Sequence, residues 1–374
     1  MIIAYFPPVV GGTEIQTLRL AKALITRNVS PIVITRRIRG IRRFEQVDGV
    51  SVYRLFTLGS GTVASLSFMF SSFLFLIKNR RKYQIIHAHL PSSPAITATV
   101  AGRVLRKKVM VKFACSGKTG NIQTSDRTCL GRAKLRFLMK YDDVFVCPSE
   151  EVERELINYG FDKERVVEIP NGVDTALFHS VDDLQKGNLR KRFNFPSLPI
   201  MVYTGRLESR KRLAILLEAW QRVVKVKESY LLIVGDGSQK DRLINLAKKL
   251  KIIESVKFTG RVDSVNEYLQ AGVGFVFPSS AEGLSNALLE AMATELAIVA
   301  TKIGGTEEAI ENEKNGILVE PDNVDELANG IITLLSQPEV AHKFGREARR
   351  TIEENYSIGI VAQKHLKVYE EMIK

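Results

Sequence analysis

Two glutamates, Glu282 and Glu290, stand in a segment that predicts a strand, a loop and a helix. Residues 273–278 form a short apolar run typical of a buried strand, and residues 285–294 have the pattern of a helix capped by Ser285. Glu282 then lies in the loop, and Glu290 lies in the second turn of the helix. A helix N-terminus binds phosphate through its amides, whereas carboxylates accept hydrogen bonds from neutral hydroxyls. The pair indicates a sugar nucleotide site, and the alternative is that both glutamates are solvated at the surface.

Two cations follow another apolar run, residues 200–204, which predicts a strand. Gly205-Arg206-Leu207 comes next, and Lys211 stands just before a predicted helix. Arg206 offers a planar pair of donors and Lys211 a point charge, which together suit a diphosphate. The alternative is surface charge on a turn, and that is our interpretation of Arg210 and Arg212, which we expect to face solvent.

A glycine pair, Gly11 and Gly12, follows the first predicted strand, residues 2–6, and precedes a predicted amphipathic helix over residues 13–26. Residues without side chains let backbone amides approach a ligand, so this pair suits the same phosphates. A tight turn is the alternative interpretation.

The elements that must position these residues are apolar strands that alternate with helices in both halves of the chain. This alternation predicts an α/β fold in which each half is a doubly wound parallel sheet, and 374 residues fit two such domains facing a cleft. We expect the first domain to span residues 1–170 and the second to span residues 171–357. Ligands of such sheets bind beyond the carboxyl ends of the strands, which is where the motifs above lie. The expected strands are residues 2–6, 31–35, 50–56, 84–87, 109–114 and 144–148, and then 200–204, 230–234, 256–259, 273–278 and 297–300.

The net charge of +13 is concentrated in the first half of the chain. Residues 1–170 carry 27 Lys and Arg against 13 Asp and Glu, whereas residues 171–374 carry 27 against 28. A basic face of this kind attracts anionic lipid, an acidic polymer or nucleic acid. The basic clusters at residues 36–43, 78–82 and 103–112 contain no aromatic residue, and the chain shows no nucleic-acid-binding motif, so we expect no nucleic acid partner.

Three scattered cysteines, Cys115, Cys129 and Cys147, show no metal-ligand spacing, and no other motif suggests a metal site. They fit a protein of the reducing cytoplasm, where we place this chain, and a peripheral position at the inner face of the membrane remains open.

Residues 63–77 (VASLSFMFSSFLFLI) have only serines for polarity and are too short to span a bilayer. One interpretation is a helix buried against the sheet. The other is a helix at a membrane surface, with the basic residues 78–82 at the anionic headgroups.

The motifs, taken together and in order, resemble the retaining glycosyltransferases of family 4, which have the GT-B fold. The resemblance covers nearly the whole chain, and its most specific part is the segment with the two glutamates. It rests on residues 7–14 (PPVVGGTE), 87–89 (HAH), 170–174 (PNGVD), 205–211 (GRLESRK) and 282–293 (EGLSNALLEAMA).

The resemblance implies a donor site for a nucleoside diphosphate sugar, UDP- or GDP-linked, that requires no metal and no other cofactor. Glu290 would bind the ribose hydroxyls and Glu282 the donor sugar, while Arg206 and Lys211 neutralise the leaving diphosphate. The catalytic residues implied are thus Glu282, Arg206 and Lys211. The remaining donor-binding residues implied are Gly11, Gly12, Gly283, Leu284, Ser285, Arg261 and Val262.

The resemblance also implies that the first domain binds a lipid-linked or polysaccharide acceptor and that transfer retains the anomeric configuration. A final helix, residues 358–374, would cross back to the first domain. A non-catalytic nucleotide-sugar-binding protein and a sugar nucleotide epimerase of the same fold remain as alternatives.

The sequence departs from the family pattern at one place. Many relatives carry a histidine after the strand that matches residues 109–114, but this chain has Cys115 and Ser116 there. No histidine role is therefore carried over, and Ser116 and His89 remain as candidates on the acceptor side. His87 ends the same strand as His89, and both are open to the alternative that loop backbone satisfies them. The few residues before Pro7 predict a first strand shorter than that of relatives.

Overall fold

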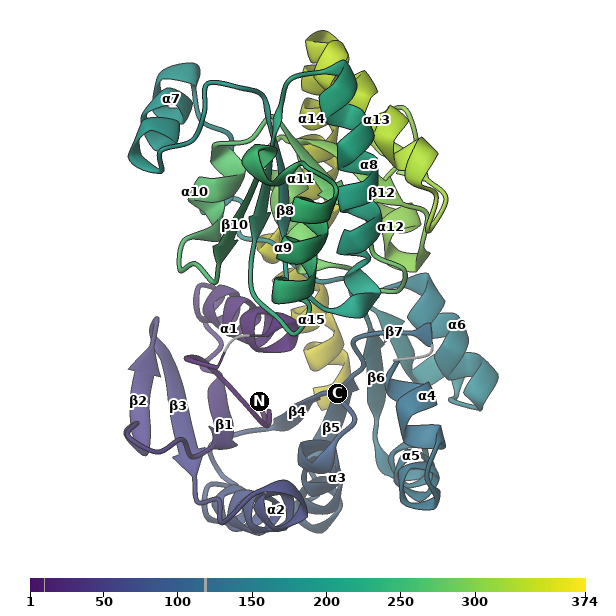
Figure 1. Cartoon of the computed structure of the whole chain (residues 1–374). Helices are drawn as coiled ribbons and strands as arrows, with labels where there is room; N and C mark the ends of the chain where they lie inside the picture. The colour runs from purple at the N-terminus through teal and green to yellow at the C-terminus, as the bar shows by residue number, and fades with distance from the viewer. Residues whose placement is uncertain (10, 118–119) are drawn as a thin grey trace. The chain divides into compact units, whose positions relative to one another are not determined.

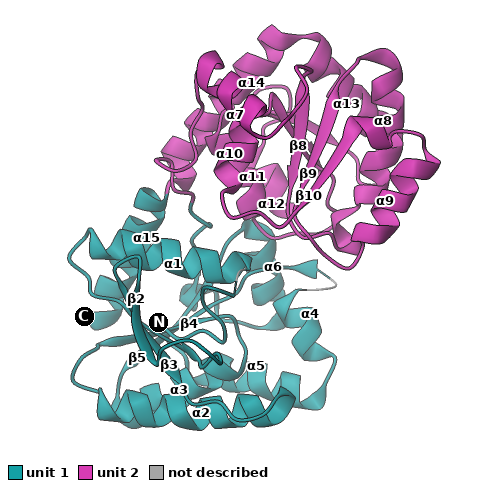
Figure 2. Ribbon diagram, turned by 60° about the vertical axis from the view of Figure 1, so that its left-hand side comes forward, with its two compact units in different colours: residues 1–172, 358–374 teal, residues 173–357 magenta. Residues whose placement is uncertain are grey.

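The computed structural model describes residues 1–9, 11–117 and 120–374, and it divides into two compact units (Figures 1 and 2). Unit 1 contains residues 1–172 together with 358–374, and unit 2 contains residues 173–357. The division falls after Gly172, where the sequence predicted it after Pro170.

Unit 2 is built on a six-stranded parallel sheet with the strand order β10-β9-β8-β11-β12-β13. The chain runs outward from β8 in one direction and then returns to start outward from β11 in the other, so β8 and β11 are the strands at which the order reverses. The strands are β8 (Ile200–Thr204), β9 (Tyr230–Val234), β10 (Val256–Gly260), β11 (Gly274–Phe277), β12 (Ala297–Thr301) and β13 (Ile317–Val319).

Both faces of this sheet are buried, because its strands alternate their apolar side chains between two cores. One core packs α8, α9 and α13 on the sheet, and the other packs α10, α11 and the end of α14 on it. The helices of unit 2 are α7 (Asp183–Arg192), α8 (Leu213–Val226), α9 (Lys240–Lys249), α10 (Val265–Gln270), α11 (Asn286–Ala293), α12 (Gly304–Ala309), α13 (Val324–Ser336) and α14 (Pro338–Thr351).

Unit 1 contains a parallel sheet of order β4-β5-β6-β7 and a three-stranded sheet of order β1-β3-β2, in which β2 pairs antiparallel with β3. The predicted strand over residues 2–6 is wrong as a full strand. Only Ile2 forms bridges, to Ile34 of β1 and Ala88 of β4, and it thereby joins the two sheets. The strands are β1 (Ile32–Arg36), β2 (Phe44–Val47), β3 (Val50–Leu55), β4 (Ile85–His89), β5 (Lys108–Lys112), β6 (Val144–Cys147) and β7 (Val166–Glu168).

The last helix, α15, belongs to the core of unit 1. Val361 and Val368 pack with Met110 and Val146 of the sheet, and Ala362 packs with Leu24 of α1. The helices of unit 1 are α1 (Gly12–Ile25), α2 (Gly61–Lys78), α3 (Ser93–Leu105), α4 (Asn121–Asp126), α5 (Cys129–Tyr141), α6 (Glu150–Tyr159) and α15 (Ile358–Ile373).

Candidate functional site

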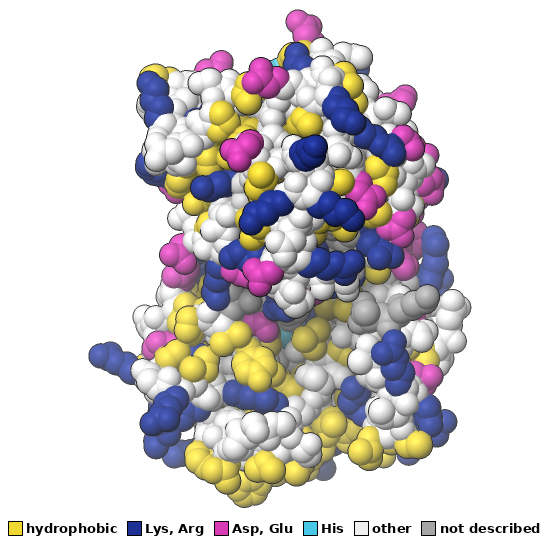
Figure 3. Space-filling model, viewed as in Figure 1, with side chains coloured by type: hydrophobic (Ala, Val, Ile, Leu, Met, Phe, Trp, Pro, Cys, Tyr) yellow, Lys and Arg dark blue, Asp and Glu magenta, His cyan; other side chains and the backbone are white. Residues whose placement is uncertain are grey.

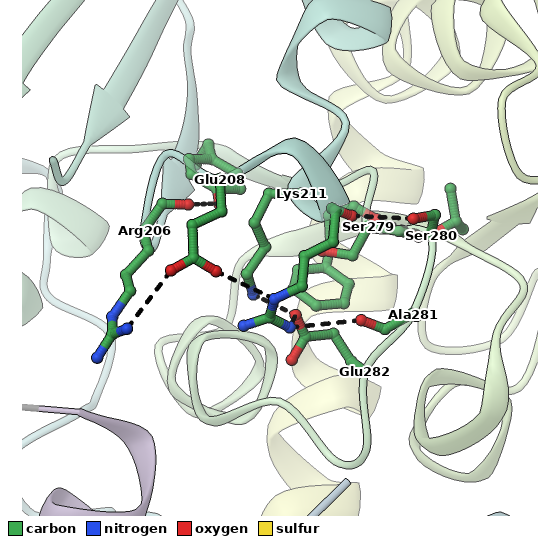
Figure 4. A network of polar contacts seen from close by, with 11 residues as sticks. Arg206, Glu208, Lys211, Ser279, Ser280, Ala281 and Glu282 are labelled. Atoms are coloured by element: carbon green, nitrogen blue, oxygen red, sulfur yellow. Dashed lines mark hydrogen bonds and ion pairs between the residues drawn. The ribbon is translucent and has the colours of Figure 1, made fainter. Parts of the chain in front are cut away.

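The strand order of unit 2 brings two predicted motifs together. The carboxyl ends of β8 and β11 are neighbours in the sheet, so the loop that holds Arg206 and Lys211 lies beside the loop that holds Glu282 (Figure 4). Backbone contacts fix the two loops to each other, because the carbonyl of Arg210 accepts hydrogen bonds from the amide of Ser280 at 2.9 Å and from its hydroxyl at 3.1 Å. This junction is the ligand-binding position of a doubly wound sheet.

Glu282 is held between two cations at this junction. Its carboxylate accepts a hydrogen bond from Lys211 Nζ at 2.6 Å and also contacts the guanidinium of Arg210. Both Lys211 and Glu282 are largely buried, so little water screens the pair. The predicted neighbours Glu282 and Lys211 therefore meet directly.

We predicted that Arg210 faces solvent, and this prediction was wrong, because Arg210 pairs with two carboxylates. Its Nε donates to Glu208 at 3.1 Å, and Glu208 also pairs with Arg206 at 3.4 Å, as Figure 4 shows. The charges alternate from Arg206 through Glu208 and Arg210 to Glu282. The sequence signal that was missed is the alternation of positive and negative side chains between residues 206 and 210. The carboxylate between two cations reduces their repulsion, so several cations can lie in one site.

Arg212 pairs with Asp322 at 3.0 Å, and its side chain remains 43 % exposed. Arg206 is 63 % exposed, so it is the cation of the site that is most open to an incoming anion.

Burial perturbs the ionisable groups around Glu282. Burial lowers the pKa of Lys211, and the negative charge of Glu282 opposes that effect. The same carboxylate and, first of all, burial raise the pKa of Tyr203, whose side chain lies on β8. The Lys211 ammonium also lies 5.3 Å from the centre of the Phe277 ring. Lys211 is thus a weakly hydrated cation, which binds an anion more strongly than a cation in water does.

Helix α11 begins beside this cluster, as the sequence predicted. Ser285 is its N-cap in extended conformation, although its hydroxyl makes no capping hydrogen bond. Gly283 and Leu284 lie in the loop that enters the helix, and Glu290 lies in its second turn with 7 % exposure. Glu290 is not a solvated surface residue, so that alternative is wrong for it.

Glycines fix the loops where a side chain would not fit. A Cβ on Gly305, in the first turn of α12, would stand 2.7 Å from the carbonyl oxygen of Gly283. A Cβ on Gly237, in the loop after β9, would stand 2.6 Å from the backbone of Leu207. The shapes of the Glu282 and Arg206 loops depend on these close approaches, which no spacing in the sequence revealed.

We expect Gly305→Ala to weaken nucleotide sugar binding while the fold persists. The added methyl group must push Gly283 and Leu284 away, at a cost typical of overpacking, about 1–3 kcal/mol. Titration of the purified variant with donor measures the loss. Gly187→Ala is the matched control, because a Cβ at that position of α7 meets no atom within 4 Å. Equal losses in both variants would contradict this role of Gly305.

The other predicted donor residues of unit 2 lie after β10. Arg261 is exposed, and Val262 packs against the core that contains α11. The preceding residue, Gly260, accepts a hydrogen bond from the amide of Gly235 at 2.9 Å. The loops after β9 and β10 are thereby joined at the same edge of the sheet.

The remaining predicted residues belong to unit 1. Gly11 is the N-cap of α1, and Gly12 is its first residue, so both stand at a helix N-terminus. Ser116 is buried and lines a pocket of about 450 Å³ together with residues of α4 and α6. Lys118, two residues after Ser116, lies outside the residues that the structure describes.

His89 lies inside unit 1 in a cluster of buried rings. It stacks on His87 with ring centres 4.2 Å apart, and His87 in turn stacks on His365 of α15 at 5.7 Å. His87 Nδ1 and the hydroxyl of Tyr369 share a hydrogen bond of 2.7 Å, so a side chain and not loop backbone satisfies this ring nitrogen. Lys112 of β5 lies nearby and donates to Asn171, and burial lowers its pKa to about 8. The burial of Lys112 was missed because this residue ends a run of basic residues, 103–112, and such a run is typical of a solvated surface.

We expect acid to destabilise unit 1 through these histidines. Burial, followed by the nearby positive groups, lowers the pKa of His87 and of His89, and burial lowers that of His365 to about 3. The folded state keeps them neutral, whereas the unfolded chain protonates them below about pH 6.5. The contribution of these histidines to stability is therefore full above pH 6.5 and is lost as the pH falls; for His365 the loss is about 1.4 kcal/mol per pH unit until the pH reaches its folded pKa of about 3.

Three carboxyl groups of unit 1 act in the opposite direction, because burial raises the pKa of Asp142 to about 8 and also raises the pKa of Glu155 and of Glu168. A histidine variant isolates the histidine contribution, because these carboxyl groups are present in both proteins. Thermal melting between pH 7 and pH 5 should show a smaller loss for His365→Leu than for the wild type. His342→Leu, at an exposed position of α14, is the control. An unchanged slope in His365→Leu would exclude this role for His365.

Comparisons with known proteins agree with this architecture. Residues 10–177 match the family model described as Glycosyltransferase Family 4, and residues 185–351 match that of Glycosyl transferases group 1. N-acetyl-alpha-D-glucosaminyl L-malate synthase of Bacillus anthracis is 24% identical over 80% of this chain and 77% of its own length.

Two further proteins extend the comparison. The UDP-Gal:alpha-D-GlcNAc-diphosphoundecaprenol alpha-1,3-galactosyltransferase of Escherichia coli is 24% identical over 80% of this chain and 78% of its own length. The crystal structure of HepE of Anabaena in complex with UDP-glucose superposes with a TM-score of 0.82 at 19% identity, covering 99% of each chain. The fold is therefore that of GT-B proteins.

Proposed function

Because this chain belongs to the family 4 glycosyltransferases, we propose that it moves a sugar from a UDP- or GDP-linked donor to a lipid-linked or polysaccharide acceptor and retains the anomeric configuration. One observation carries the proposal. A buried lysine, Lys211, and a carboxylate, Glu282, meet at the switch point of the unit 2 sheet, next to the exposed Arg206 and the start of α11.

The cations of this site supply the charge that a leaving diphosphate needs. As the bond between the anomeric carbon and the diphosphate oxygen breaks, negative charge accumulates on the phosphates, and Lys211 and Arg206 are placed to neutralise it. A preorganised cation in a site with little water gains more from this charge than it would in bulk water. We therefore propose that these side chains take the place of a metal ion.

Donor binding would also change the partners of Glu282. Without a ligand, its carboxylate contacts Lys211 and Arg210. Phosphates compete for these cations, so the carboxylate becomes available to accept hydrogen bonds from hydroxyls of the donor sugar. Glu290, in the second turn of α11, would accept from the ribose hydroxyls in the same way.

We propose that the acceptor attacks on the face from which the diphosphate leaves. The acceptor oxygen forms the new bond to the anomeric carbon, the diphosphate departs with the electrons of the old one, and the acceptor proton passes to the leaving phosphate. These steps balance charge without a protein base, and the product keeps the configuration of the anomeric carbon.

The acceptor class draws support from two features. The Escherichia coli relative carries in its name a diphosphoundecaprenol acceptor, which is a lipid-linked glycan. The excess of positive charge in this chain lies in its first half, which suits an anionic lipid-linked substrate. The three cysteines are not joined in disulfides, and we propose the cytoplasm as the compartment.

A donor panel tests the proposal. Purified protein is mixed with UDP, GDP and ADP sugars and scored by thermal shift for binding and by nucleoside diphosphate release for turnover, with a chelator present. The expected result is one donor that both stabilises the protein and is hydrolysed slowly. Stabilisation without release, even with lipid and glycan acceptors added, would favour a binding protein. No stabilisation by any donor would overturn the assignment of the site.

A further inference from the structure

We propose that the outer face of α2 docks unit 1 onto an anionic lipid bilayer, with the helix lying along the membrane surface. The proposal concerns unit 1 alone and does not depend on which sugar unit 2 binds.

Helix α2 has two opposite apolar faces. Ala64, Phe68, Ser72 and Leu76 recur at every fourth position and are buried, and Phe68 and Leu76 belong to the core that α3 completes. On the other side lies a second row of apolar residues, which we call the outer stripe and which is 49–65% exposed: Val63, Leu66, Phe70 and Leu74. A helix turns about 100° per residue, so the outer stripe is centred opposite the buried one.

The outer stripe continues into the chain before the helix, where Phe56 and Leu58 are each 57% exposed. In Figure 3, hydrophobic side chains gather along the lower edge, where Figure 1 places α2. An exposed apolar surface of this extent marks a site of interaction.

The charge around the stripe identifies the partner. Residues 49–125 contain no Asp or Glu, although they contain many Lys and Arg. Arg80, Arg81 and Lys82 follow α2 and are exposed. Lys107, after α3, lies 5.8 Å from the ring of Tyr83, which places a further cation beside this end of α2. Apolar residues flanked by cations match the acyl boundary and the headgroups of an anionic membrane.

The packing decides how the helix meets the membrane. Helix α2 is long and apolar enough to cross a bilayer by length and composition alone. Its inner face is nevertheless part of the unit 1 core, so crossing would expose Phe68 and Leu76 and open that core. Lying along the surface buries the outer stripe and keeps the inner face in place.

Charge also argues against a second copy as the occupant. A twofold contact brings the same patch of both copies together. Here that would place the cations after α2 of one copy near those of the other, with no carboxylate within residues 49–125 to offset them. A bilayer that contains phosphatidylglycerol supplies the opposite charge.

An introduced fluorophore tests insertion directly. The chain has a single tryptophan, Trp220, which is fully buried in unit 2 and therefore gives a constant background. In Phe70→Trp, the new indole should show a blue-shifted emission when vesicles of phosphatidylglycerol and phosphatidylcholine are added. Leu184→Trp is the matched control, because Leu184 is also exposed but lies on α7 of unit 2, and its emission should not shift.

A charge variant tests the headgroup contact. The triple variant Arg80→Gln, Arg81→Gln, Lys82→Gln should bind the same vesicles more weakly, by about fivefold for each charge removed, and wild-type binding should fall with salt. The control removes three exposed lysines of unit 2, Lys225, Lys248 and Lys249, in the same way. Donor hydrolysis without vesicles should be equal in the wild type and both triple variants, which separates this test from that of the proposed function.

The proposal fails if the Phe70→Trp emission does not shift on vesicles that sediment the protein, since the stripe is then not the contact. Equal affinity for pure phosphatidylcholine vesicles would remove the electrostatic part. Loss of a dimer in Leu66→Ser/Phe70→Ser, measured by sedimentation, with unchanged vesicle binding would show that a second copy covers the stripe instead.

Discussion

Replacing Lys211 with alanine should lower the turnover of the donor by about 10²–10³-fold, which is the usual effect of losing one preorganised group that stabilises developing charge. The ammonium is buried and lies 2.6 Å from Glu282, whereas Arg210, the other cation that contacts this carboxylate, is more exposed to solvent. The loss should appear in kcat more than in KM, because the charge on the leaving diphosphate is largest in the transition state. Steady-state release of nucleoside diphosphate measures both constants.

Two further variants make this prediction specific. Lys211→Met keeps an unbranched side chain that is one atom shorter and removes the ammonium group, so it should lose as much turnover as Lys211→Ala while filling most of the same space. Lys314→Ala removes an exposed cation that pairs with Glu311 and should behave as the wild type. Normal turnover in Lys211→Met would contradict the role of the ammonium.

Replacing Glu290 with glutamine should weaken binding of the nucleoside diphosphate by roughly 10–100-fold. A hydrogen bond to a charged group contributes about 1.5–3 kcal/mol, and the amide keeps the shape of the carboxylate while removing its charge. The expected loss is in affinity, with a smaller change in the turnover of bound donor. Calorimetric titration with UDP or GDP, whichever stabilises the protein, gives the dissociation constant.

The control for Glu290 is an exposed glutamate on a helix of the same unit. Glu339→Gln, in the first turn of α14, should leave the dissociation constant unchanged. Since Glu290 is buried, the melting temperature of the ligand-free variant must also be measured. If affinity is unchanged in a folded Glu290→Gln protein, Glu290 does not contact the nucleotide.

The sequence predicted the central strands of unit 2 because their burial on both faces produces continuous apolar runs. It missed β13 (Ile317–Val319), which is three residues long, and β2 (Phe44–Val47), which is four residues long and has no buried residue. The strand over residues 2–6 was predicted from apolar character, but the structure retains only the bridges of Ile2. Short segments carry too few residues for their pattern to be distinguished from that of loops.

Within the site, residue types and spacing placed Glu282, Lys211 and Glu290 on the correct elements. They did not reveal that Arg210 shares Glu282 with Lys211, because that contact depends on β8 and β11 being neighbours although 72 residues separate the two side chains. The close approach of Gly305 to Gly283 was missed for the same reason. Contacts between distant segments follow from strand order, which a local pattern does not contain.

The helix α2 shows a different limit. Its sequence is apolar all round, so the pattern favoured a buried helix only slightly over a membrane-surface helix. The structure shows that Phe68 and Leu76 are buried while Phe70 and Leu74 are exposed. The inner face thus fits the interpretation of a buried helix, and the outer face fits that of a membrane-surface helix. The vesicle experiments test the role of the outer face.

The position of the nucleotide tests the central claim most directly. A crystal structure of the protein with the nucleoside diphosphate that stabilises it should show the diphosphate at the start of α11, in contact with Arg206 and Lys211, and the ribose hydroxyls at Glu290. Glu282 should then have exchanged at least one of its cations for solvent or donor. A nucleotide bound anywhere other than the junction of β8 and β11 would contradict the account.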